Sequence, residues 1–141
     1  MVSEPSAITI SKMTEVRHLS VSIAQSPDVV YAFLSDPVNF PKWASGLGSL
    51  ALVNGAWVAQ TPEGAMPVRF SGRNPYGILD HWVSPKSGPE IHIPMRVIAN
   101  GEGSELLSAL FRQPGMDQKK FDADAEWVTR DLNKAKTILE G

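Results

Sequence analysis

Residues 117–140 read DQKKFDADAEWVTRDLNKAKTILE, the longest patterned segment of the chain. Asp117 opens this segment, and Gly141 follows it at the end of the chain. The apolar residues recur in steps of four and three, which places them on one stripe of a helix with 3.6 residues per turn. The stripe consists of Phe121, Ala125, Val128, Leu132, Ala135 and Leu139. At about 1.5 Å per residue, this helix is expected to be about 35 Å long, the width of a small domain.

The chain begins its patterned part with one strand and two short helices. Residues 16–24 alternate between apolar and polar side chains, which predicts a half-buried strand. Ser26 is then placed to cap a helix that has Pro27 at its first position, and Pro37 ends that helix. A second short helix is predicted over residues 41–45, which include a tryptophan.

A run of strands occupies the middle of the chain. Asn54-Gly55 is a strong signal for a two-residue hairpin turn, because both residues tolerate a positive φ angle. Turns rich in Gly and Pro separate the later segments, and short connections imply antiparallel neighbours. The predicted strands cover residues 51–53, 57–59, 66–73, 78–84, 91–99 and 105–112. We therefore predict an α+β fold in which a curved antiparallel sheet of about six to seven strands wraps around the long C-terminal helix.

Two segments give this order of elements a family resemblance. Residues 21–44, VSIAQSPDVVYAFLSDPVNFPKWA, resemble the opening of the START-like, helix-grip (SRPBCC) superfamily, which includes the birch-pollen-allergen fold, polyketide cyclases and lipid-transfer domains. YGILDHWV, residues 76–83, and the stretch from Pro94 to Asp117 resemble a bacterial subfamily of it. The resemblance covers roughly residues 16–140. It implies a cavity between the sheet and the long helix, and it implies no shared set of catalytic residues.

Composition limits the other classes of function. The 141 residues suit one domain, which we place at residues 15–141 after a flexible N-terminal arm at residues 1–14. A net charge of −2 argues against a nucleic-acid partner, and no apolar run is long enough for a membrane span. The chain has no cysteine, and its start does not resemble a secretory signal, so a cytoplasmic location is expected. The sequence leaves the oligomeric state open, with a homodimer among the alternatives.

Metal and cofactor sites are not expected. The three histidines, His18, His81 and His92, fall on separate predicted strands without the spacing of a metal motif. No glycine-rich phosphate loop opens a helix, and no Gly-x-Ser-x-Gly elbow is present. We therefore predict no metal and no cofactor.

The last predicted hairpin supplies a candidate cavity wall. If Gly101-Glu102-Gly103 is its turn, residues of the same parity on the two strands share a face. The apolar set is then Ile91, Ile93, Met95 and Val97 with Leu107, Ala109 and Phe111, and we expect it to face the helix. The other set is expected to face outward: His92, Arg96, Ser108 and Arg112.

The strand over residues 78–84 has two alternative orientations. Either Leu79, His81 and Val83 face inward, or the set that contains Asp80 does, and each choice brings one ionisable group into the core. Such a group must be paired or must shift its pKa toward the neutral form. The pair Asp80-His81 is thus either an ordinary outer charge beside a satisfied imidazole, or a ligand-orienting group or general base.

The remaining candidates are aromatic residues and arginines. Arg69 and Arg73 are expected to face solvent, with contact to a ligand carboxylate at the cavity mouth as the alternative. Trp43 is expected at the cavity entrance, and Trp127, off the helix stripe, against the sheet edge or a partner. The predicted ligand-binding residues are Trp43, Val68, Phe70, His81, Met95, Phe111, Val128 and Leu132.

Three functions follow from these expectations. The leading one is binding of a hydrophobic small molecule, such as a lipid, a polyketide-like compound or an aromatic compound, in the cavity. The second is an enzyme of cyclase or hydrolase type that uses Asp80 and His81. The third is a protein-interaction module, as in the chaperone-activating members of the superfamily that the chain resembles, with an exposed apolar patch near Trp127.

Overall fold

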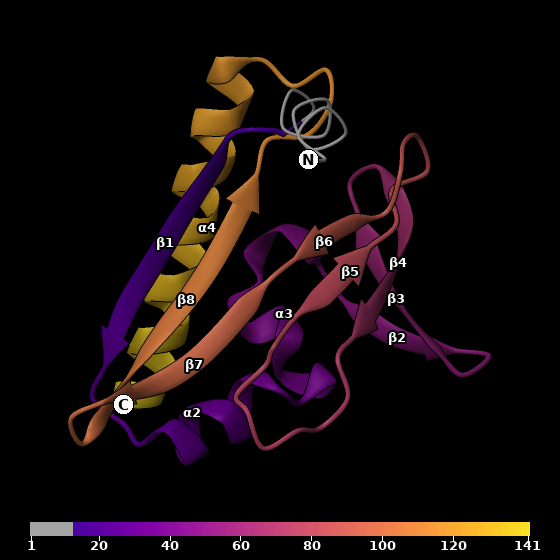
Figure 1. Ribbon diagram of the computed structural model, residues 1–141. Coiled ribbons are helices and arrows are strands. Elements are labelled where there is room, and N and C mark those ends of the chain that lie inside the picture. The colour runs from indigo at the N-terminus through magenta and orange to yellow at the C-terminus, as the bar shows by residue number, and fades with distance from the viewer. Residues whose placement is uncertain (1–12) are drawn as a thin grey trace, which may run out of the picture.

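The computed structural model describes residues 13–141, so most of the predicted arm at residues 1–14 lies outside the described residues. The elements in chain order are β1 (Val16–Ile23), α2 (Pro27–Leu34), the 3₁₀ turn η1 (Pro37–Asn39), α3 (Phe40–Trp43), the 3₁₀ turn η2 (Ser45–Leu47), β2 (Leu50–Val53), β3 (Ala56–Thr61), β4 (Gly64–Phe70), β5 (His81–Val83), β6 (Ile91–Ile93), β7 (Met95–Asn100), β8 (Gly103–Phe111) and α4 (Gln118–Glu140). Figure 1 shows α4 lying along β1 and β8, and α2 lying near the lower end of β7. The short helix α3 contacts α4. The predicted α+β helix-grip architecture is confirmed.

The strands form two sheets where one was expected. The first sheet has the order β1-β8-β7 and the second the order β2-β3-β4-β5-β6, all antiparallel. The predicted strand at residues 91–99 is divided at Pro94, which has no backbone N–H to give to a neighbouring strand. The chain therefore passes from the second sheet into the first at Pro94, whose carbonyl accepts a hydrogen bond from the Ala109 N–H at 3.1 Å.

The long helix has the predicted stripe. Asp117 caps it by accepting a hydrogen bond from the Lys120 N–H at 2.8 Å. Four stripe residues are buried, and the other two, Val128 and Leu139, are half-buried against the core. At the far end, the Glu140 carboxylate accepts a hydrogen bond from the Ala24 N–H, which fixes α4 to the end of β1. The helix is thus held at its end as well as along its apolar face.

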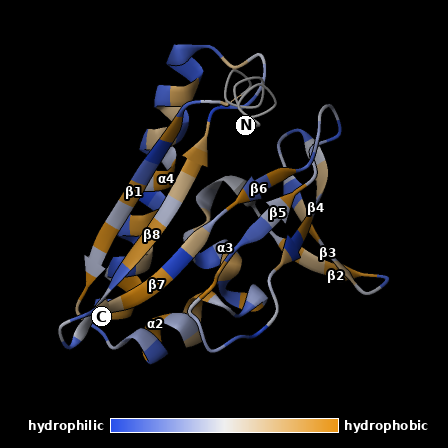
Figure 2. Cartoon of the chain, viewed as in Figure 1, coloured by the Kyte–Doolittle hydropathy of each residue, from blue (hydrophilic) through white to orange (hydrophobic). Residues whose placement is uncertain are grey.

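The turn between β7 and β8 overturns one prediction. Asn100 pairs with Gly103, so the turn contains two residues and not the three that were assumed. A shift of one residue exchanges the two faces of a strand. Ser108 consequently faces inward beside Met95, whereas Leu107, Ala109 and Phe111 face outward. Figure 2 shows that β7 and β8 both carry hydrophobic and hydrophilic residues.

The structure also selects one face for the segment at residues 78–84. Leu79, His81 and Val83 are buried, while Asp80 and Trp82 lie on the outer face. The Asp80 carboxylate accepts a hydrogen bond from the Met95 N–H at 3.0 Å, directly after Pro94. This bond supplies a partner for a backbone donor at the point where the chain changes sheets.

Candidate functional site: a pocket between α3, the sheet and α4

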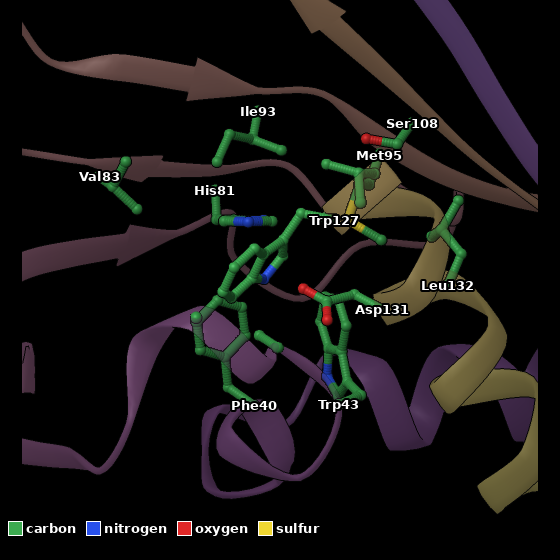
Figure 3. Close-up of a pocket in the computed structure, with 13 residues that line it drawn as sticks. Phe40, Trp43, His81, Val83, Ile93, Met95, Ser108, Trp127, Asp131 and Leu132 are labelled. Carbon is green, nitrogen blue, oxygen red and sulfur yellow. The ribbon is translucent and has the colours of Figure 1, made fainter. Parts of the chain in front are cut away.

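A pocket of about 200 Å³ lies where α3, the inner face of β5 to β8 and the middle of α4 meet (Figure 3). Its lining is largely aromatic and aliphatic, and only a few polar side chains reach it. The lining residues are Phe40, Trp43, Ala44, Gly46, His81, Val83, Ile93, Met95, Ser108, Trp127, Val128, Asp131 and Leu132. The pocket lies at the place where the sequence predicted a cavity, between the sheet and the long helix.

The first wall is the aromatic helix α3. Asp36 caps the preceding turn through a hydrogen bond from the Val38 N–H at 3.0 Å, and Pro37 begins that turn. This start directs Phe40 and Trp43, which are both buried, toward the sheet. The two rings meet edge to face, with centroids 5.2 Å apart. Local capping thus positions two large aromatic side chains at the pocket.

His81 supplies the second wall from β5. Its ring is enclosed by aromatic neighbours, with centroids 5.2 Å from Phe40 and 6.4 Å from Trp43. Burial lowers the pKa of His81 from 6.5 to about 4, an effect only partly opposed by a hydrogen bond to the Leu79 carbonyl and by the charge of Asp80. His81 is therefore a neutral imidazole at neutral pH, and it projects from the sheet into the pocket (Figure 3).

The third wall is the middle of α4, where Asp131 joins the helix to the segment after α3. One carboxylate oxygen of Asp131 accepts hydrogen bonds from the Ser45 N–H at 3.2 Å and the Ser45 hydroxyl at 2.6 Å. Burial raises the pKa of Asp131, against the effect of these two bonds. Asp131 therefore holds two walls of the pocket together and also presents a carboxylate to it.

Trp127 lies at the rim of the same wall. Its side chain is 45% exposed, and the Arg130 guanidinium lies over its ring at 4.9 Å. The indole packs against Gly46, where an added Cβ atom would come within 3.1 Å of Trp127 Nε1. A glycine at position 46 thus allows Trp127 to close one side of the pocket. The alternative of a partner-binding patch at Trp127 stays a prediction.

One polar atom beside the pocket lacks a partner. The Trp43 indole N–H is fully enclosed and has no hydrogen-bond acceptor among residues 13–141. Leaving a buried donor unpaired costs about 1–3 kcal/mol. The aromatic wall is therefore not arranged for maximum stability, which is a common property of binding sites.

Five of the eight predicted ligand-binding residues line the pocket: Trp43, His81, Met95, Val128 and Leu132. Val68 and Phe70 lie on the inner face of β4 behind the lining, where Phe70 contacts the Phe40 ring at 5.1 Å. Phe111 lies on the outer face of β8 and is 36% exposed, so its predicted place in the cavity was wrong. The error follows directly from the turn length between β7 and β8.

Other lining residues were not predicted. Ser108 was assigned to the outer face because of the same turn, and its hydroxyl donates a hydrogen bond to the Pro94 carbonyl at 3.3 Å. Asp131 precedes the stripe residue Leu132, and a charged residue beside an apolar stripe gives no signal of its own. Phe40 could have been found, because a short helix that brings Trp43 inward places the residue three positions earlier on the same side.

The side chains of Asp80 and His81 lie on opposite faces of the sheet. The Asp80 carboxylate pairs with His92 at 2.8 Å on the outer side of the sheet, while His81 points into the pocket. The arginines also lie on outer surfaces, as expected. Arg69 stacks on Trp82 at 4.2 Å, and Arg73 lies over Tyr31 at 5.8 Å.

A second, shallower hollow lies on the opposite side of the sheet, with a volume of about 340 Å³. Met95 and Ser108 line both this outer hollow and the pocket. In residues 13–141, no cluster of three or more histidine or carboxylate side chains is placed to hold a metal ion. No helix in that part of the chain is long and apolar enough to cross a membrane.

Comparisons with known proteins agree on the fold. No protein-family model matches the sequence, and no curated protein matches it. Among solved structures, the protein XoxI from Bacillus cereus is 15% identical with a TM-score of 0.71, and the alignment covers 88% of this chain and 94% of that chain. Ara h 8.0201 is 11% identical with a TM-score of 0.67, and the alignment covers 89% of this chain and 97% of that chain.

DynU16, a protein of the dynemicin biosynthetic locus, gives a third match. It is 18% identical with a TM-score of 0.69, over 89% of this chain and 47% of that longer chain. Identities this low show a shared fold and carry no assignment of activity. The chain has a helix-grip fold, which it shares with these structures.

Proposed function

We propose that this helix-grip domain binds a compact, mostly apolar small molecule in the pocket between α3, the sheet and α4. The observation that carries the proposal is a preformed pocket whose lining is largely apolar and which a few polar side chains reach. Small-molecule sites in proteins have this composition: apolar walls give affinity, and a few polar groups give orientation.

The size of the pocket narrows the class of ligand. A dry cavity of about 150 Å³ is large enough for benzene, while drug-sized ligands occupy about 300–1,000 Å³. The pocket here measures about 200 Å³. This volume favours a molecule with one or two fused rings over a long acyl chain or an extended polyketide.

The chemistry of the walls favours an aromatic ligand. Phe40, Trp43 and Trp127 present three aromatic rings, and His81 adds a fourth. Aromatic pairs gain about 0.5–1.5 kcal/mol beyond the burial of their surface, which an aliphatic chain does not obtain. We therefore place aromatic compounds ahead of the lipids among the expected ligands.

The enzymatic alternative has less support. An acid–base pair of Asp80 and His81 would need both groups within reach of one substrate. Asp80 instead accepts hydrogen bonds from His92 and the Met95 N–H on the outer face. The binding proposal needs only the pocket itself.

The test uses 2-methylnaphthalene as a compact apolar probe and isothermal titration calorimetry as the measurement. Val128 is half-buried and lines the pocket, so Val128→Trp fills part of the volume and should abolish binding. Lys134→Trp adds the same side chain at an exposed position of the same helix and should leave the affinity unchanged. Val128→Phe is a smaller change for the case in which the tryptophan variant does not fold.

Two results would contradict the proposal. One is the absence of heat on titration with 2-methylnaphthalene and with every other one- or two-ring compound tried. The other is binding that Val128→Phe and Val128→Trp leave unchanged while both variants keep the wild-type circular dichroism spectrum. Loss of binding in the Val128 variants, with unchanged binding in Lys134→Trp, would support the proposal.

A further inference from the structure

We infer that the ligand carries a hydrogen-bond donor, such as the hydroxyl of a phenol or the N–H of an aromatic amine, and that the pocket discriminates against carboxylate anions. The inference rests on the proposed function and names the chemistry of the ligand's polar group. It is drawn from the hydrogen-bond acceptors that reach the pocket and from the lack of a lysine or arginine among the lining residues.

The first polar atom is Nε2 of His81. The other ring nitrogen, Nδ1, lies 3.4 Å from the Leu79 carbonyl oxygen. A carbonyl only accepts hydrogen bonds, so Nδ1 carries the proton in this contact. In a neutral ring the second nitrogen is then an acceptor. Nε2 has no hydrogen-bond partner among residues 13–141, and His81 lines the pocket, so this acceptor is available to a ligand.

The neutral state of His81 follows from its surroundings. The ring is 5% exposed and packs against Phe40, Trp43 and Phe70. The nearby titratable groups, Asp80 and His92, lie on the outer face of the sheet and oppose each other in their effect on the pKa of His81. Burial outweighs both and holds that pKa at about 4.

The second polar group is the Asp131 carboxylate on the facing helix. Burial raises the pKa of Asp131, and the two hydrogen bonds that Ser45 donates to Oδ1 oppose this effect by favouring the ionised form. The other oxygen, Oδ2, has no hydrogen-bond partner among residues 13–141. An ionised carboxylate only accepts hydrogen bonds. His81 and Asp131 therefore offer acceptors from two walls of the pocket.

The pocket offers an anion no charged partner. Neither lysine nor arginine is among the lining residues, and Arg130 lies over the Trp127 ring. The Ser108 hydroxyl already donates to the Pro94 carbonyl, and the Trp43 N–H is enclosed. Among the side chains of residues 13–141 that line the pocket, the Trp127 N–H, which lies against Gly46, remains as a neutral donor. Burial of an anion without a cation or several donors is strongly unfavourable.

The experiment compares three probes of one ring system at pH 7.5 by calorimetry. 2-Methylnaphthalene has no donor, 2-naphthol has a donor of nearly the same size, and 2-naphthoate is an anion. We expect the wild-type chain to bind 2-naphthol about five- to tenfold more tightly than 2-methylnaphthalene, the gain from one hydrogen bond. We expect no measurable binding of 2-naphthoate.

The variants assign this preference to residues. His81→Phe keeps an aromatic ring and removes one of the two acceptors, so it should reduce the preference for 2-naphthol over 2-methylnaphthalene. His92→Phe makes the same change on the outer face and should keep the preference. Asp131→Asn keeps the oxygen that accepts from Ser45 and removes the charge, so 2-naphthoate should begin to bind.

The outcomes separate the two proposals. Equal affinity of the wild-type chain for 2-naphthol and 2-methylnaphthalene would overturn the donor inference and leave the binding proposal in place. Binding of 2-naphthoate as tight as that of 2-naphthol would also overturn it. Failure of all three probes would overturn both. Should His81→Phe fail to fold, the wild-type ranking and Asp131→Asn still decide the inference.

Discussion

Strands β4, β5 and β6 carry two different rows of side chains on their two faces. The inner row, in register across the strands, is Phe70, His81 and Ile93. The outer row, one position along each strand, is Arg69, Trp82 and His92. The inner row contacts Phe40 and the pocket, whereas the outer row lies toward solvent.

The side chains of the outer row form a continuous stack, and the residue at each end of the stack pairs with a carboxylate. Arg69 lies 4.2 Å from the Trp82 ring centre, and Trp82 stacks on His92 with centroids 4.8 Å apart and planes 6° from parallel. Glu90 pairs with Arg69 at 3.2 Å, and Asp80 pairs with His92 at 2.8 Å. The Arg69 guanidinium and the His92 imidazole thus each have a carboxylate partner on the same surface.

The two histidines show what this difference means. His92 is exposed and has a carboxylate partner, while His81 is buried among rings and has only a long contact to a carbonyl. Asp80 is adjacent to His81 in the sequence and yet pairs with His92. Alternation along β5 therefore satisfies the outer imidazole within the fold and leaves the inner one with a free acceptor for a ligand.

The largest effect on stability is expected for a substitution on the inner face of the sheet. Phe40→Ala removes a ring that is 2% exposed and touches Trp43, Phe70 and His81, so it should lower the free energy of unfolding by about 3–5 kcal/mol. Trp82→Ala on the outer face should cost only about 1–2 kcal/mol, because its neighbours stay hydrated. Urea denaturation followed by circular dichroism measures both. Equal losses would show that the two faces contribute alike.

The second effect is the pH dependence of stability that the buried His81 contributes. Its pKa is about 4 in the folded chain against 6.5 for an exposed imidazole. Between these values the unfolded chain binds a proton that the folded chain does not, so stability is complete above pH 6.5 and falls as the pH decreases to 4. The full loss should be about 3 kcal/mol.

The measurement compares urea denaturation of the wild-type chain at neutral pH and at pH values down to 4 with that of His81→Phe. The variant should lack this part of the loss, and the difference between the two chains removes the contribution of the carboxylates. His92→Phe is the matched control and should retain it. A wild-type loss that His81→Phe reproduces in full would contradict the assignment.

The smallest effect on stability is expected for a substitution in the outer row. Arg69→Ala removes one end of the stack and its ion pair with Glu90, and both groups are largely exposed. The cost should be below about 1 kcal/mol and should decrease at high salt. Thermal denaturation at low and high sodium chloride tests this. A loss of several kcal/mol would mean that the outer stack supports the fold as strongly as the inner row does.

Features set by local chemistry could be predicted from the sequence. The stripe on α4, the Ser26 cap and the Asn54-Gly55 hairpin each depend on neighbouring residues, and all three occur as expected. Asn54 and Gly55 both have positive φ angles, as that turn requires. The overall fold follows from these elements and their order.

Features set by register could not be predicted in the same way. Whether the β7–β8 turn has two or three residues changes neither composition nor alternation, yet it moves Ser108 inward and Phe111 outward. The face of β5 was equally open, since each face held one ionisable residue. The polar groups of the pocket, His81, Ser108 and Asp131, were therefore the least predictable part of the site, although its apolar residues came mostly from the predicted set.

Directly after the break at Pro94, the sheet is the only layer between the pocket and the outer hollow. Met95 and Ser108 face each other across β7 and β8, and they line the pocket on one side and the outer hollow on the other. At this point a single layer of residues separates the pocket from the outer hollow. Ser108→Gly would remove one of the two side chains between the pocket and the outer hollow. This change would connect the two spaces through the sheet and leave the residues of α3 and α4 unchanged.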